Sequence, residues 1–79
     1  MNTPPHTLTA LEAETLVADF QRFGWTDAEL MANFDAIRDQ RNAAYWASPH
    51  LESEQAARAA ERNADAVRWA LHLRHCKTI

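Results

Sequence analysis

The stretch FGWTDAEL, residues 23–30, decides how this chain folds, because it contains both a helix stop and a helix start. Gly24 is the only glycine in the sequence, and glycine ends helices readily because it adopts the left-handed backbone conformation without strain. The residues that follow, Thr26-Asp27-Ala28-Glu29, form a capping box that opens a second helix. The stretch is therefore either the turn of a DNA-reading helix-turn-helix or the corner of a small helical bundle.

The charges after the turn favour the bundle corner. In a helix-turn-helix, the second helix reads bases and phosphates through Arg, Lys, Asn or Gln near its N-terminus. Residues 26–37 contain no Arg or Lys, and the acidic side chains of Asp27 and Glu29 would repel phosphate. Arg38 and Arg41 come too late in the helix to replace the missing contacts. We therefore expect this stretch to fold the first two helices into a hairpin.

The first helix is expected over residues 10–23. A second capping box, Thr9-Ala10-Leu11-Glu12, marks its start. At 100° per residue its apolar residues share one face: Ala13, Leu16, Val17, Phe20 and Phe23. Residues 1–7 are polar and proline-rich and are expected to form a flexible arm, whereas residues 8–77 are expected to form a single three-helix domain.

The second helix is expected over residues 27–46, and a break at Ser48-Pro49 separates it from the third. The predicted apolar stripe of the second helix is Leu30, Phe34, Ile37, Arg41, Ala44 and Tyr45. Ser48 as N-cap with Pro49 as first helical residue is one start for the third helix. Ser53 is a later alternative, and the helix is expected to continue to about Arg74–Lys77.

The third helix is rich in alanine and apolar over much of its circumference. Its main stripe is Ala60, Ala64, Val67 and Leu71, and a second set widens it: Ala56, Ala59, Ala66, Ala70 and Leu73. Together they cover roughly 200° of arc, about twice the width that one buried face needs. A chain of 79 residues with a single cysteine buries little surface alone. The prediction is an all-α, three-helix unit, a helical hairpin plus a long third helix, that forms a helical-bundle homodimer of two-fold symmetry.

The composition limits which partners, cellular location and source organisms are expected. The net charge of −3 argues against general attraction to nucleic acid or to an anionic membrane. No apolar run approaches the roughly 20 residues that cross a bilayer, and the N-terminus does not resemble a secretory leader. The lone Cys76 fits a reducing compartment, so a cytoplasmic location is expected. An excess of arginine over lysine, with abundant alanine, is typical of GC-rich bacterial or phage genes.

Residues that could carry chemistry are few. His72, His75 and Cys76 lie within about one helical turn and are zinc-ligand types. A structural site needs four ligands, however, and apart from His50 and His6 the chain offers no partner motif. An activated Cys76 thiolate is a further alternative near the chain end. Asp35 and Asp39 are expected to lie on a solvated face. We therefore expect no metal, no cofactor, no catalytic residue and no enzymatic activity.

Large or charged side chains in unexpected places mark a candidate partner-binding site: Trp69, Leu73, Ala66, Trp46 and Arg41. Trp46 and Trp69 point almost opposite to the main stripes of their helices, so each either caps the bundle or faces a partner. Arg41 interrupts its apolar stripe. Its guanidinium reaches either an acid of the same chain, Glu54 or Glu61, or an acid of a partner.

These features predict a small non-enzymatic protein that acts by binding another protein, as an adaptor, inhibitor or regulator. The alternative is a nucleic-acid-binding regulator with a degenerate helix-turn-helix, in which Arg58, Arg62 and Arg68 contact phosphates. An enzyme or metalloprotein that uses the cluster of residues 72–76 is the third possibility. The sequence does not identify the target protein.

Overall fold

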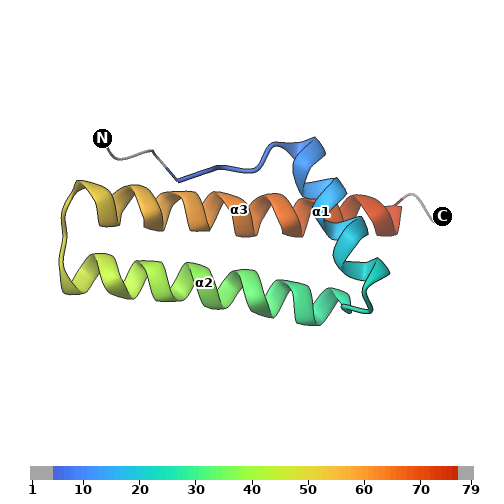
Figure 1. Cartoon of the computed structure of the whole chain (residues 1–79), viewed down its shortest axis with the longest axis horizontal. Coiled ribbons are helices and arrows are strands. Elements are labelled where there is room, and N and C mark those ends of the chain that lie inside the picture. The colour runs from blue at the N-terminus through green and yellow to red at the C-terminus, as the bar shows by residue number, and fades with distance from the viewer. Residues whose placement is uncertain (1–4, 77–79) are drawn as a thin grey trace.

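The computed structural model describes residues 5–76. In this range the chain is all-α, as predicted, with helices α1 (Ala10–Arg22), α2 (Asp27–Ala47) and α3 (Leu51–Cys76) and no strand. α2 and α3 run antiparallel along the length of the molecule, and α1 lies across the C-terminal half of α3 (Figure 1). Residues 1–4 of the predicted arm and the predicted helix end at Lys77 fall outside the described residues.

Both predicted capping boxes are confirmed. At the start of α1, the Thr9 hydroxyl accepts from the Glu12 backbone N–H at 3.1 Å, and the Glu12 carboxylate accepts from the Thr9 backbone N–H at 3.0 Å. Thr26 and Glu29 repeat this exchange at the start of α2. Each box satisfies donors that a helix N-terminus leaves without a partner, which fixes where both helices begin.

The corner at Gly24 forms where backbone hydrogen bonds end α1. Gly24 has a φ of 98°, and its N–H donates to the Gln21 carbonyl while the Trp25 N–H donates to the Phe20 carbonyl. This pattern is the Schellman motif, and it normally brings the flanking apolar side chains together. Here the rings of Phe20 and Trp25 meet edge to face with centroids 5.2 Å apart. Phe23, expected on the buried stripe, is instead 80% exposed, because the helix ends at Arg22 and Phe23 is its C-cap.

The third helix begins at neither predicted serine. α3 starts at Leu51, and the Ser53 hydroxyl accepts from the His50 backbone N–H at 3.1 Å, so Ser53 stabilises the start from inside the helix. Ser48 is the C-cap of α2, with a φ of −147° and a ψ of 77°. The Ser48 backbone N–H donates to the Ala44 carbonyl at 3.0 Å, so Ser48 closes α2 instead of opening α3.

The close antiparallel hairpin consists of α2 and α3, so the prediction that the first two helices pair in this way is wrong. α1 makes most of its contacts with α3 and touches α2 only slightly. One cluster of buried residues joins the three helices: Ala13, Val17, Leu30, Val67, Ala70 and Leu71. The corner at residues 23–26 therefore directs α1 across the hairpin instead of along it.

The predicted main stripe of α3 is confirmed as core. Ala60, Ala64, Val67 and Leu71 are all buried, and so are Ala59 and Ala70 of the widening set, while Ala56, Ala66 and Leu73 are half-buried. α2 packs against α3, and α1 packs across its C-terminal half. The apolar arc of α3 is thus largely covered within one chain, without a second subunit.

The inward face of α2 differs from the predicted stripe beyond Phe34. Ile37, Arg41 and Ala44 are exposed, whereas the predicted Tyr45 is half-buried, and a polar set is half-buried beside it: Asp35, Arg38 and Asn42. The small alanines of the facing part of α3 leave little for a large apolar residue of α2 to pack against. Polar side chains occupy the seam instead, and Asp35 reaches across it to Arg68 at 3.1 Å.

Residues 5–9 form no helix, and Asn63 of α3 holds part of this segment. The Asn63 side-chain oxygen accepts from the Leu8 backbone N–H at 2.7 Å, and its amide nitrogen donates to the His6 carbonyl at 3.1 Å. Leu8 itself packs against the core cluster. Asn63 therefore fixes the path by which the chain enters α1 (Figure 1).

Candidate partner-binding surface

Trp69 is the centre of the surface predicted on α3, and it is 57% exposed. Its ring lies 5.4 Å from the imidazole ring of His72, tilted by 32°. Leu73 and Ala66 lie within one turn on either side of it and are half-buried, and Ala66 packs against the core cluster. The indole is therefore a large apolar group outside the core, and its ring contact is with His72 on the same helix.

Trp46 lies at the other end of the hairpin. It is 75% exposed, and its ring meets that of Tyr45 edge to face with centroids 5.2 Å apart. Trp46 borders a shallow groove that Ala57 of α3 also lines, and Ala57 is about 18 Å along the helix from Trp69. The two tryptophans thus belong to two separate surfaces, and the predicted site divides between them.

Arg41 is exposed on α2, and its expected internal ion pair is absent. Glu54, one of the two acids considered for it, pairs with Arg58 at 2.7 Å. Among residues 5–76, Arg41 forms no ion pair with Glu61 or with any other acid. Of the two alternatives for its guanidinium, an acid of the same chain is therefore not found, and an acid of a partner stays a prediction.

Ion pairs occupy two of the three arginines considered as phosphate contacts. Arg68 bonds both Asp35 on α2 and Asp65 on its own helix, at 3.1 and 3.4 Å, and Arg58 bonds Glu54. The same network includes Arg38, whose pKa is raised mainly by its hydrogen bond to Asp39. Since these cations already face carboxylates, fewer of them are available to neutralise phosphates.

The two histidines of the 72–76 cluster point to different partners. The His72 ring lies 3.6 Å from the Cys76 sulfur, whereas the His75 ring bonds Asp27, the first residue of α2, at 2.6 Å. In the part of the chain that the structure describes, no three His, Cys, Asp or Glu side chains gather as metal ligands would. His75 instead helps to tie the end of α3 to the corner, where Gln21 also bonds Asp27.

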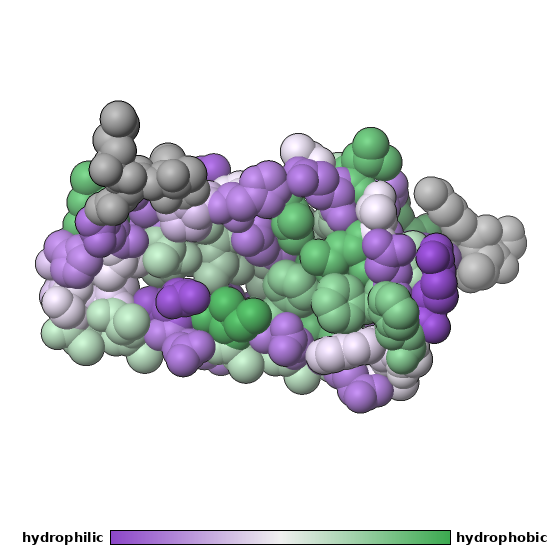
Figure 2. All heavy atoms as spheres, in the orientation of Figure 1, coloured by the Kyte–Doolittle hydropathy of each residue, from purple (hydrophilic) through white to green (hydrophobic). Residues whose placement is uncertain are grey.

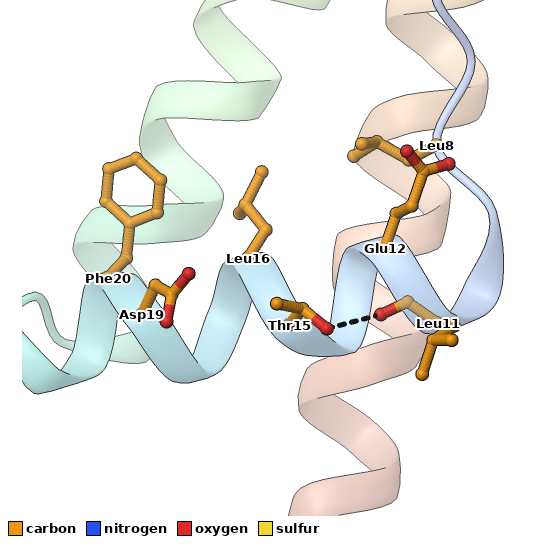
Figure 3. Close-up of a pocket in the computed structure, with 7 residues that line it drawn as sticks. All are labelled: Leu8, Leu11, Glu12, Thr15, Leu16, Asp19 and Phe20. Carbon is orange, nitrogen blue, oxygen red and sulfur yellow. Dashed lines mark hydrogen bonds between the residues drawn. The ribbon is translucent and has the colours of Figure 1, made fainter.

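A groove along α1 was missed by the sequence reasoning. It has a volume of about 520 Å³ and is lined by Leu8, Leu11, Glu12, Thr15, Leu16, Asp19 and Phe20. Figure 3 shows Leu16 and Phe20 projecting from one side of α1, with Glu12 and Leu8 at its N-terminal end. Hydrophobic side chains gather over α1 and the adjoining part of the hairpin on the face seen in Figure 2. The available signal was Leu11, a large apolar residue outside the predicted stripe of the first helix.

Within residues 5–76, no helix is long and apolar enough to cross a membrane. Comparisons of the whole chain with protein-family models, with curated proteins and with solved structures find no match.

Proposed function

We propose that this chain is a small non-enzymatic protein that acts by binding another protein, as an adaptor, inhibitor or regulator. The observation that carries the proposal is the position of Trp69, a tryptophan 57% exposed on a helix whose opposite face forms the core. Tryptophan is enriched among the few residues that supply most of the binding energy at protein interfaces. The half-buried Leu73 and Ala66 beside it extend the apolar contact area.

The charged groups around Trp69 support a protein partner over a nucleic acid. Asp65 lies one turn before Trp69 on α3, and its carboxylate is bonded to Arg68. An aromatic anchor rimmed by paired charges matches the usual anatomy of a protein interface, in which polar groups surround an apolar centre. Phosphate binding instead needs unpaired cations, and Arg68, the arginine next to Trp69, is already paired with Asp35 and Asp65.

The test is affinity capture from a bacterial lysate with the wild-type chain and two variants. Trp69→Ala should lose the specific partner, with a loss of about 2 kcal/mol or more in binding free energy, while its helicity and melting stay close to wild type. Leu51→Ala is the matched control, because Leu51 is 67% exposed on the same helix but far from Trp69. Equal retention of every captured protein by Trp69→Ala would refute the proposed surface.

We also propose a two-fold homodimer in the cytoplasm of a bacterium or an infected host cell. The support for the dimer is the exposed Trp46 at one end of the hairpin, since the arc of α3 is largely covered within the chain. Sedimentation at micromolar concentration should give twice the monomer mass of 9.0 kDa. A monomer at those concentrations, with full helicity, would remove the dimer from the proposal.

A further inference from the structure

The groove along α1 is a second surface, separate from the one around Trp69. Its lining comes from α1 and from Leu8 just before it. Its volume of about 520 Å³ lies within the roughly 300–1,000 Å³ of small-molecule pockets, but those pockets enclose most of their ligand. This groove is open along its length, so it suits an elongated segment that lies on it better than a small molecule.

The apolar part of the groove is held in place by the fold. Leu8, Leu16 and Phe20 pack with one edge against the core cluster and present the other edge to the groove. Leu11 is 72% exposed, so a ligand can bury most of its side chain. The Phe20 ring is further fixed by its edge-to-face contact with Trp25. A ligand would therefore meet a preformed apolar strip.

The charged residues that line the groove are both acidic. The Glu12 carboxylate accepts from the Thr9 backbone N–H at 3.0 Å and bonds the His6 ring at 2.9 Å, and these contacts lower its pKa, so it is ionised at neutral pH. Asp19 is half-exposed and lies 3.7 Å from Arg22, which does not line the groove. Seven residues separate the two acids, which is about 10 Å along a helix.

We propose that this groove binds an amphipathic helix of another protein whose apolar face is flanked by basic residues about two turns apart. Helices recognised in this way place apolar residues at intervals of three or four on the strip, and complementary charges at the rim set their orientation. The groove runs from Leu8 to Phe20, which corresponds to about three turns of a bound helix. A second copy is the poorer occupant, because no two Arg or Lys residues of this sequence are seven positions apart.

The probe is a synthetic helical peptide of about 14 residues, long enough for three to four turns, with leucines on one face and lysines seven residues apart at its edge. A second peptide carries glutamates in place of the lysines. Fluorescence anisotropy measures binding, and chemical shifts of backbone amides locate it. The lysine peptide should bind and shift the amides of α1, the glutamate peptide should bind far more weakly, and added salt should reduce the difference.

Two pairs of variants separate groove binding from general attraction to an acidic chain. Asp19→Lys should weaken binding of the lysine peptide about fivefold. Asp39→Lys makes the same charge change on α2 and should change this affinity little. Leu11→Ser should weaken it about tenfold, and Leu51→Ser, at a similarly exposed leucine, should not. Circular dichroism checks that each variant is folded.

Three results would overturn the groove proposal. They are no binding of the lysine peptide to the wild-type chain, equal losses in the groove variants and their controls, and amide shifts confined to residues outside α1. The proposed function through Trp69 can fail without affecting this test, because Trp69→Ala leaves every groove residue in place. Conversely, Asp19→Lys can lose binding of the peptide whether or not a partner is captured through Trp69.

Discussion

Asn63 provides a quantitative test of how the N-terminal segment is attached to the fold. Its side chain makes two hydrogen bonds to backbone groups of His6 and Leu8, at 3.1 and 2.7 Å. At about 1 kcal/mol net for each bond, Asn63→Ala loses about 2 kcal/mol. Alanine also has the higher helix propensity, by roughly 0.6 kcal/mol. The free energy of unfolding should therefore fall by about 1.4 kcal/mol.

Asn33 is the matched control. It lies inside α2, is exposed and makes no side-chain hydrogen bond with any other residue in the range 5–76. Asn33→Ala keeps the gain in propensity without losing a contact, so it should stabilise the chain by roughly 0.6 kcal/mol. The two variants should differ by about 2 kcal/mol, or about 8–16 °C in melting temperature for a domain of this size.

Urea denaturation followed by circular dichroism measures both free energies, and hydrogen exchange of the Leu8 amide reports the contact directly. In Asn63→Ala this amide should exchange faster, because its acceptor is gone. If Asn63→Ala and Asn33→Ala shift stability equally and the Leu8 amide exchanges as in the wild type, then Asn63 does not hold the segment and the reasoning fails.

The other predictions concern the corner, the core and the first helix cap. Gly24→Ala should lower the free energy of unfolding by about 1 kcal/mol through its φ of 98° alone, since an added Cβ meets no atom within 4 Å. An unchanged midpoint in urea denaturation would contradict this. Leu30→Ala should lower the free energy of unfolding by about 2–5 kcal/mol because Leu30 is 1% exposed. Leu11→Ala should change it by no more than about 0.5 kcal/mol, and similar losses in the two variants would contradict the assigned core. The hydrogen bond from the Thr9 backbone lowers the pKa of Glu12 below 4.5. The ionised Glu12 therefore stabilises the fold above that pH, and this stabilisation is lost as the pH falls through the lowered pKa. Glu12→Gln should remove this part of the acid dependence of stability, and an unaltered acid profile would contradict the assigned cap.

Local signals in the sequence predicted the helix boundaries well because the physics that sets them is local. The two capping boxes and the Gly24 stop involve residues three to five positions apart, so their hydrogen bonds are determined by neighbours in the chain. The third start was missed for the same kind of reason. Ser53 bonds back to His50 from inside the helix, and a serine at that position looks like a cap that begins a later helix.

The packing of the helices against one another could not be predicted from such local signals. The stripe of α3 and its widening set predicted six of the seven buried residues of that helix and missed Ala57, and they did not predict which helix covers them, since alanines accept several neighbours equally well. The seam of α2 was misassigned because hydrophobicity alone placed Ile37 inward, whereas Asp35 and Arg38 are half-buried with their charges paired. Asn63 did leave a signal. It is a polar residue four positions after Ala59 and seven before Ala70, both buried, and a polar group on a buried arc needs a partner.

The alanine-rich composition explains why so many large apolar side chains remain outside. Alanine lets helices approach closely, but each buried alanine removes little surface from water. Among residues 5–76, only Leu30, Val17 and Val67 are large side chains that are fully buried. A close hairpin of this kind has no interior space for a tryptophan. The large apolar residues that the core does not accommodate therefore lie on its outside, and in the described part of the chain five of them are more than half exposed: Leu11, Phe23, Trp46, Leu51 and Trp69. Because Leu11, Trp46 and Trp69 lie on three different helices, each of their surfaces can be removed by one substitution while the alanine core stays intact, which is why the proposed contacts can be tested one at a time.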